Sequence, residues 1–344
     1  MTIQTRQVHL IHRPDGLARP SDFRVVEVLL PDLADGQVLV ENLWMSIDPY
    51  MRRSMSSEAT DLEPWPIGHA LDGPSVGRVI ASRNPAFNVG DLVESMSGWQ
   101  EHFISNGGHY VPYLSPNDSL AQRSVAGARP QDFVGLLGVA ALTAYAGMVC
   151  LARCEAGETA VISSGAGTVG SLACQIGKIK GLRVVSSAGT DGKVRWLEEV
   201  AGVDCAFNYR NGSIAESLAK TCPKGIDLVL ENASPEHLSA CLPLMKELKQ
   251  ILIAGFVSTY STGGKVRIDN FEYVLDRFLT IQSYRFMDSL NVYDQFVDDM
   301  LRWRSEGRLT LAEVIHEGIE TAPEALCGLF TGNRIGKSLV RLRA

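Results

Sequence analysis

Three glycines, Gly165, Gly167 and Gly170, follow the spacing G-x-G-x-x-G and lie between two segments of different character. The segment before them, 158–165, is apolar and typical of a buried strand, whereas 168–180 repeats its apolar residues with the period of a helix. In a strand–turn–helix unit such glycines allow a tight turn and a close approach of the backbone to a pyrophosphate. The pattern therefore predicts a dinucleotide-binding site rather than a flexible turn alone.

Strand-like and helical patterns continue to alternate from residue 128 to residue 307. Such alternation predicts a parallel, doubly wound sheet with helices on its faces, an α/β domain. The strands predicted after the glycines are 183–188, 205–209, 226–232, 249–256 and 279–286, and the helices are 193–200, 214–220, 234–242 and 290–307.

Residues 1–127 have a different rhythm, in which short strand-like runs are broken by Gly, Pro and Asn turn signals. Short strands separated by turns predict a β-domain. Residues 308–344 return to short elements and are expected to rejoin it. With 344 residues the chain is long enough for two domains with separate cores, so we predict a β-domain (1–127), a dinucleotide-binding domain (128–307) and a returning segment (308–344).

Composition excludes several classes of protein. The formal net charge is -7, so no basic surface for nucleic acid is expected. The first ten residues lack the pattern of a secretory signal, and the seven cysteines include no C-x-x-C pair, so we expect a cytoplasmic protein with reduced thiols. The uncharged stretch 133–152 is long enough to cross a bilayer but is rich in Gly, Ala and Thr. We predict that it is a buried helix and that the protein has no membrane contact.

The end of the second predicted strand indicates which dinucleotide binds. A site for NAD usually carries Asp or Glu about 20 residues beyond the glycines. Here Ser186, Ser187 and Ala188 end the strand, and Lys193 and Arg195 follow. Positive charge at this point suits a 2′-phosphate, so the sequence favours NADPH/NADP, with a solvated helix lysine as the alternative interpretation of Lys193.

Seven short motifs resemble the zinc-independent medium-chain dehydrogenase/reductase superfamily. The chain is most similar to the branch of leukotriene B4 12-hydroxydehydrogenase/prostaglandin reductases, plant alkenal double-bond reductases and bacterial curcumin-reductase-like proteins. The motifs, of which DPYMR is the most specific, are SIDPYMRRSM (46–55), GWQEHFI (98–104), LTAYAGM (142–148), GAGTVG (165–170), AGTDGK (188–193), FNY (207–209) and GFVSTY (255–260). The resemblance covers nearly the whole chain. It implies a GroES-like β-domain plus a Rossmann domain, usually in a dimer, and NADPH-dependent reduction of the C=C bond of α,β-unsaturated carbonyl compounds.

The resemblance also implies site residues. Lys193 and Tyr209 would contact the adenosine 2′-phosphate. Tyr260 would lie near the nicotinamide ribose and the substrate carbonyl, and Tyr50 would line the substrate mouth, although either tyrosine could instead be a packed structural residue. The other cofactor-binding candidates are Gly165, Gly167, Thr168, Val169, Gly170, Gly189, Asn232, Gly255, Phe256, Val257, Asn333 and Arg334. The other substrate-binding candidates are Tyr284, Arg285 and Met287.

Three positions depart from the family pattern. The segment Ala-Ser-Pro at 233–235 stands where Val-Gly-Gly usually follows the asparagine, here Asn232, so the cofactor contact there could differ. Arg334 stands where asparagine is usual, with Asn333 one residue early, and Arg285 replaces a usually apolar residue. Arginines near the pocket would suit an anionic or polar enone.

A catalytic zinc is not expected. No cysteine precedes Cys150, and Ala70 follows His69 where zinc alcohol dehydrogenases carry a glutamate. His69 alone cannot supply the three protein ligands that a catalytic zinc needs, so it is predicted to be a core or turn histidine.

The reaction implied is hydride delivery to the β-carbon of an enone. The enolate oxygen would be held by the Tyr260 hydroxyl and the ribose 2′-hydroxyl, and Tyr260 or water would return a proton to the α-carbon. An NADPH:quinone oxidoreductase and a non-catalytic NADPH-binding sensor are the alternatives.

Overall fold

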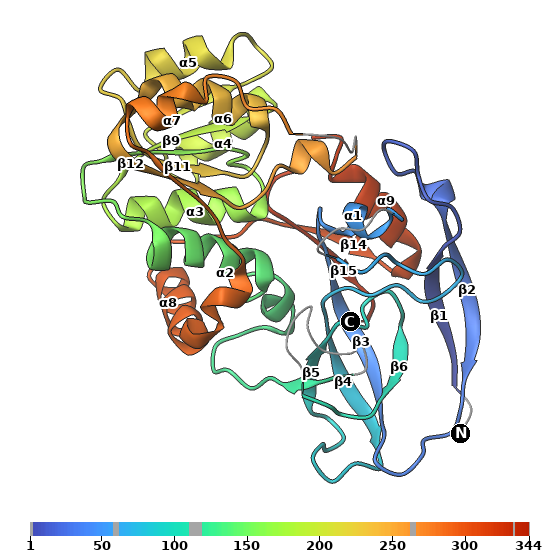
Figure 1. Cartoon of the computed structure of the whole chain (residues 1–344). Helices are drawn as coiled ribbons and strands as arrows, with labels where there is room; N and C mark the ends of the chain where they lie inside the picture. Colours follow the sequence, from blue (N-terminus) through green and yellow to red (C-terminus); the bar gives the residue numbers. More distant parts are fainter. Residues whose placement is uncertain (1–2, 58–61, 110–118, 262–265, 333, 344) are drawn as a thin grey trace. The chain divides into compact units, whose positions relative to one another are not determined.

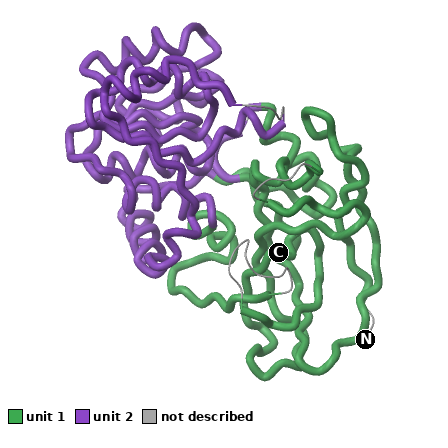
Figure 2. Tube along the Cα trace, viewed as in Figure 1, with its two compact units in different colours: residues 1–138, 313–331, 338–344 green, residues 139–312, 332–337 purple. Residues whose placement is uncertain are grey.

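The computed structural model describes residues 3–57, 62–109, 119–261, 266–332 and 334–343. It divides into two compact units (Figure 2). Unit 1 comprises Met1–Gly138, Glu313–Thr331 and Ser338–Ala344, and unit 2 comprises Val139–Ala312 and Gly332–Lys337.

Unit 1 is built on an antiparallel sheet in which β3 pairs with β4, β6 and β15 (Figure 1). A separate antiparallel pair joins β1 to β2. Its strands are β1 (Ile3–Leu10), β2 (Phe23–Leu30), β3 (Val38–Ile47), β4 (Ser75–Ser82), β5 (Leu92–Ser95), β6 (His102–Ser105), β7 (Ala121–Gln122), β14 (Glu313–Glu317) and β15 (Lys337–Arg341), and its helices include α1 (Met51–Ser54) and α9 (Ala322–Gly328). In its core the buried Trp99 ring stacks on Phe23 and meets Trp65 edge-on. The predicted β-domain is present.

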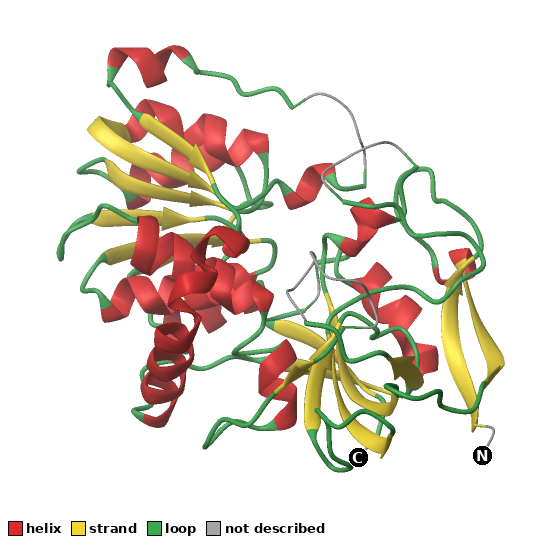
Figure 3. Ribbon diagram, turned by 60° about the horizontal axis from the view of Figure 1, so that its bottom comes forward, coloured by secondary structure: helices red, strands yellow, loops and turns green. Residues whose placement is uncertain are grey.

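Unit 2 contains a parallel sheet of strand order β10-β9-β8-β11-β12-β13, with helices on both of its faces (Figure 3). The strands are β8 (Thr159–Ile162), β9 (Arg183–Ala188), β10 (Cys205–Asn208), β11 (Ile226–Glu231), β12 (Met245–Ile253) and β13 (Thr280–Ser283). The helices are α2 (Val139–Tyr145), α3 (Thr168–Ile179), α4 (Asp191–Glu199), α5 (Ile214–Thr221), α6 (Pro235–Cys241), α7 (Glu272–Asp276) and α8 (Tyr293–Ser305). The strand order reverses at β8, and ligands of such sheets bind outside the carboxyl ends of the strands at that point.

Three helix signals in unit 2 are confirmed by the structure. Gly181 has a φ of 78° just after α3, as expected of a glycine that ends a helix. Ser234 caps α6, with Pro235 in the first turn. Phe296, Met300 and Trp303 form the buried face of α8. The predicted doubly wound fold is confirmed.

The prediction of one buried helix over 133–152 was wrong. The stretch is largely buried, but it consists of the end of a 3-10 helix (Pro130–Val134), then α2, then a π-helical turn (Ala146–Leu151). Gly135, which ends the 3-10 helix with φ −118° and ψ −102°, breaks the helical path. No helix in the described part of the chain is long and apolar enough to cross a membrane.

The observed units end at 138/139 and 312/313, whereas the sequence suggested 127/128 and 307/308. The 3-10 helix Pro130–Val134 packs against β3 and β4, which keeps residues 128–138 in unit 1. Residues 332–337 belong to unit 2 because Gly336 donates its N–H to the carbonyl of Ala166, at 2.8 Å.

Candidate active site

The glycine loop between β8 and α3 has a separate physical reason for each glycine. A Cβ on Gly165 would lie 1.9 Å from Ser186 Oγ, and one on Gly170 would lie 2.3 Å from the carbonyl oxygen of Ser164, so neither position accepts a side chain. A Cβ on Gly167 would have its nearest neighbour at 3.4 Å, which is ordinary contact. Packing within the protein therefore does not demand a glycine at 167, whereas the approach of a pyrophosphate would.

The start of α3 fits an anion. Gly167 is its N-cap and provides no side-chain hydrogen bond, so no capping side chain competes with an anion for the first N–H groups and the positive end of the helix dipole. The following Thr168 and Val169 begin the helix, and Thr168 donates from Oγ1 to the carbonyl of Gly336 at 3.2 Å. That bond brings Arg334, two residues before Gly336, into the same part of unit 2. Asn333 lies outside the described residues.

A second group of candidates meets where β9 and β10 end. A Cβ on Gly189 would lie 2.7 Å from Tyr209 Oη and 3.4 Å from Arg210 Nε. Lys193 is in the first turn of α4, where its N–H donates to Thr190 Oγ1 at 3.3 Å. The parallel pairing of β9 with β10 therefore brings Gly189, Tyr209 and Arg210 together.

The charges of this group are unbalanced. Burial, and then the charge of Arg210, lower the pKa of the half-buried Lys193. Neither cation forms an ion pair with another residue that the structure describes, and the nearby Asp191 accepts hydrogen bonds from Asn208 and Asn211 instead. Two adjacent cations without a carboxylate repel each other, and a phosphate between them would remove that cost. This geometry suits the 2′-phosphate of NADP.

Tyr260 folds back over the carboxyl end of β12. The N–H groups of Ala254 and Gly255 donate to the carbonyl of Glu231, at 2.9 and 3.4 Å, and thereby fix the loop that contains Phe256. A short 3-10 helix, Val257–Thr259, leads into Tyr260. The Tyr260 hydroxyl lies 2.7 Å from where a Gly255 Cβ would be, so a side chain at 255 would displace it.

The substrate candidates occupy different surroundings. In unit 1, the partly buried Tyr50 precedes α1 and packs against the core that contains Met51. In unit 2, the buried Tyr284 donates from its hydroxyl to the carbonyl of Thr143 at 3.1 Å, and burial raises its pKa. Met287 is partly buried nearby in sequence. Contact of these residues with a substrate stays a prediction.

Arg285 is a surface residue. Its side chain is 66% exposed and pairs with Asp288 at 2.8 Å. This exposed ion pair accounts for the arginine without a ligand, so the position lends no specific support to an anionic substrate.

Arg210 and His237 are functional candidates that sequence reasoning missed. Arg210 directly follows the FNY motif, and a second cation at the same sheet edge as Lys193 was the available signal. His237 lies in α6 and its ring meets the carboxylate of Glu231, at the end of β11. No local pattern indicates that contact, because one partner is in a helix and the other ends a strand.

Within the described residues no three His, Cys, Asp or Glu side chains are grouped so that they could hold a metal ion. His69 is exposed, and its Nδ1 lies 3.0 Å from the carbonyl oxygen of Ile67, consistent with the turn histidine that was predicted.

Comparison with known proteins defines the class. A family model described as the N-terminal domain of oxidoreductase matches residues 6–112, and one described as zinc-binding dehydrogenase matches residues 168–302. The chain is 34% identical to an NADPH-dependent curcumin reductase of Escherichia coli (strain K12), over 98% of this chain and 97% of that protein. It is 35% identical to prostaglandin reductase 1 of Bos taurus, over 95% of each. The crystal structure of CurA from Vibrio vulnificus in complex with NADPH superposes with a TM-score of 0.90 at 30% identity, and the match covers 98% of this chain and 99% of that one.

The fold and the glycine site are those of a two-domain, Rossmann-type oxidoreductase with a GroES-like domain. The chain belongs to the zinc-independent branch of the medium-chain dehydrogenase/reductase superfamily, together with the curcumin and prostaglandin reductases. The resemblance inferred from the short motifs is confirmed.

Proposed function

We propose that this protein reduces the C=C bond of α,β-unsaturated ketones and aldehydes with NADPH. The observation that carries the proposal is that unit 2 combines two adjacent cations, Lys193 and Arg210, beyond the ends of β9 and β10 with the half-buried Tyr260 beyond the end of β12. The first feature suits NADPH, and the second suits a carbonyl oxygen that gains negative charge. Two relatives, an NADPH-dependent curcumin reductase and a prostaglandin reductase, agree with this chemistry by their names.

The chain's own residues have distinct tasks toward the cofactor. The backbone at Gly167 and the first turn of α3 would hold the pyrophosphate, while Lys193, Tyr209 and Arg210 would hold the 2′-phosphate. Bound NADPH supplies the hydride that the β-carbon of the substrate receives. The protein contributes orientation and charge.

Tyr260 stabilises the charge that develops on the substrate. Its hydroxyl donates a hydrogen bond to the carbonyl oxygen, which becomes an enolate oxygen as the β-carbon gains a hydride. A proton from Tyr260 or from water then reaches the α-carbon, and the product is the saturated carbonyl compound. A donor at this oxygen lowers the barrier because it binds the transition state more strongly than the substrate.

The test is a panel of acceptors with NADPH and, in parallel, NADH. The panel contains a 2-alkenal, an aliphatic enone, a 15-keto-prostaglandin, curcumin and a quinone, and products are identified by mass spectrometry. Turnover of enones to saturated ketones, faster with NADPH, is the expected result. Turnover of the quinone alone would make the protein a quinone reductase, and tight NADPH binding without any turnover would make it a sensor.

We also propose a homodimer formed by unit 2. Strand β13 is an edge of the sheet, and beside it Leu248, Leu275 and Phe278 are 77, 74 and 70% exposed. The N–H of Leu248 donates to the carbonyl of Arg277, which brings the two apolar segments together. Edge strands and exposed apolar patches are typical of interfaces. Light scattering should give twice the chain mass, and Leu275→Glu should halve it.

The seven cysteines are all unpaired. Free thiols suit a reducing compartment, so we propose that the protein acts in the cytoplasm. Cell fractionation tests this placement.

A further inference from the structure

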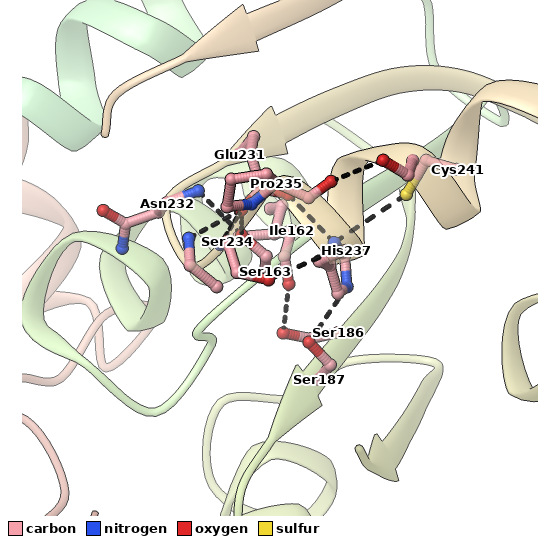
Figure 4. Close-up of polar contacts among 12 residues, drawn as sticks. Ile162, Ser163, Ser186, Ser187, Glu231, Asn232, Ser234, Pro235, His237 and Cys241 are labelled. Carbon is pink, nitrogen blue, oxygen red and sulfur yellow. Dashed lines mark hydrogen bonds and ion pairs between the residues drawn. The ribbon is translucent and has the colours of Figure 1, made fainter. Parts of the chain in front are cut away.

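A buried polar cluster lies at the carboxyl ends of β8, β9 and β11 (Figure 4). It adjoins the two segments proposed to bind the cofactor, the glycine loop 165–170 and the turn at Asn232, which together are called the binding edge below. Its centre is an ion pair between Glu231 and His237, whose side chains are 0 and 2% exposed. His237 Nδ1 lies 2.9 Å from Glu231 Oε2. Two buried charged groups are costly to desolvate, so such a pair is retained only where its geometry is well satisfied.

The carboxylate of Glu231 is fully used. Its Oε1 accepts hydrogen bonds from Ser163 Oγ at 2.8 Å and from the N–H groups of Ala233 and Ser234 at 2.6 and 2.9 Å. These bonds hold the turn that follows β11. This turn contains the segment Ala233-Ser234-Pro235, which departs from the family pattern. The buried carboxylate of Glu231 therefore fixes the backbone of this turn.

His237 connects the same carboxylate to β9. Its Nε2 lies 3.1 Å from Ser187 Oγ, and its ring stacks on Phe207 with an interplanar angle of 3°. Burial by itself lowers the pKa of His237, but Cys241 and Glu231 raise it to about 10. Each ring nitrogen lies within hydrogen-bond distance of an oxygen, Nδ1 of Glu231 Oε2 and Nε2 of Ser187 Oγ, which is the arrangement that a doubly protonated imidazolium requires.

The cluster reaches two cofactor-binding segments. Ser163 Oγ accepts from the N–H of Asn232 at 2.7 Å, and the carbonyl of Ser187 accepts from the N–H of Gly165 at 2.9 Å. In Figure 4 the Asn232 side chain points away from His237, and its amide makes no hydrogen bond to another described residue. The network thus fixes the Asn232 backbone and leaves the amide for a ligand.

We propose that the Glu231–His237 ion pair is a positioning device that holds the Asn232 turn and the glycine loop in the conformation that binds the dinucleotide. This inference rests on the proposed function only in that the ligand is NADPH. Neither side chain touches the reacting atoms. The pair acts by keeping the binding edge in one conformation, so its loss reduces the fraction of molecules that can bind and raises Kd by the same factor.

The experiment measures NADPH binding by fluorescence titration at pH 7.5 in the full-length protein. His237→Gln is expected to weaken binding about tenfold. At saturating NADPH, kcat and the KM for the enone are expected to stay within about twofold of the wild-type values. The reason is that bound cofactor holds the glycine loop and the Asn232 turn in the binding conformation. Cys222→Ala is the matched control, since the Cys222 thiol is buried in the same core cluster as Phe207 and Cys241, and its side chain contacts Thr221 Oγ1 and not His237 or Glu231.

Each outcome decides the matter. Unchanged NADPH affinity in a folded His237→Gln protein overturns the proposal. Equal weakening in Cys222→Ala also overturns it, because any loss of packing in this core would then have the same effect. Should His237→Gln not fold, Ser187→Ala removes only the oxygen that joins the ring to β9 and should weaken binding in the same direction. Nitrogen-15 NMR of the wild type should show both ring nitrogens of His237 protonated at pH 8, and a neutral ring would overturn the proposal. Failure of the wild type to bind NADPH would instead refute the proposed function.

Discussion

The buried His237 makes a prediction about stability against pH. Its pKa is raised from the ordinary 6.5 to about 10, so the folded protein binds this proton more tightly than the unfolded chain. The stabilisation is therefore fully present below about pH 6.5 and is lost as the pH rises toward 10. The perturbation that isolates the effect is the double variant Glu231→Gln/His237→Gln, in which neither partner titrates.

The magnitude follows from proton linkage. Each pH unit between the two pKa values changes the free energy of unfolding by about 1.4 kcal/mol. Between pH 6.5 and 8, allowing for partial titration of the unfolded histidine, the wild type should lose about 1.7 kcal/mol relative to the double variant. The result depends little on the folded pKa as long as it lies well above 8.

The assay is urea unfolding followed by circular dichroism, for both proteins, at several pH values from 6.5 to 8. His9 and His102, whose pKa values are lowered by burial, are present in both proteins, so their effects cancel. The buried thiols do not interfere, because burial raises the pKa of Cys222 to about 11 and of Cys174 to about 12. A difference between the two proteins that stays constant across this window would refute the protonated state of His237.

Three further outcomes are expected. Tyr260→Phe should lower kcat on a good enone about 10²–10³-fold and leave the NADPH Kd unchanged, as steady-state kinetics and fluorescence titration would show. Arg210→Gln should weaken NADPH binding about tenfold or more, and Lys220→Gln, which removes an exposed cation of α5, should change it little. Gly170→Ala should destabilise the protein because its Cβ would strike backbone, whereas Gly192→Ala, with its nearest neighbour 4.0 Å away on exposed α4, should stabilise it by about 0.5–1 kcal/mol in thermal melts.

The doubly wound sheet was predictable because its signals are local. Each parallel strand is a short apolar run, and β11 is buried along its whole length, so its pattern does not depend on distant partners. The ends of the units were not predictable in this way. Residues 332–337 belong to unit 2 through hydrogen bonds such as that of Gly336 to Ala166, which join segments far apart in the sequence.

The residues of the candidate site likewise fall into two groups, those indicated by a local sequence pattern and those brought together by tertiary contacts. The glycine loop is contiguous, so Gly165, Gly167 and Gly170 could be assigned from their spacing. Arg210 depends on the register of β9 with β10, in which Asn208 lies opposite Ala188. His237 depends on how α6 packs beneath β11, and no local pattern encodes that contact.

The two sets of charged residues should therefore control different parts of cofactor binding. The Glu231–His237 pair is neutral as a whole and supports the loops that hold the part common to NADPH and NADH. Arg210 and Lys193 lack a carboxylate partner among the described residues, so only a ligand with a 2′-phosphate compensates their repulsion. His237→Gln should weaken NADPH and NADH by the same factor, whereas Arg210→Gln should weaken NADPH alone and reduce its preference over NADH. If His237→Gln changed the ratio of the NADPH and NADH dissociation constants as strongly as Arg210→Gln does, the assignment would be wrong. The ion pair would then not act only by positioning the loops, independently of the 2′-phosphate contacts of Arg210 and Lys193.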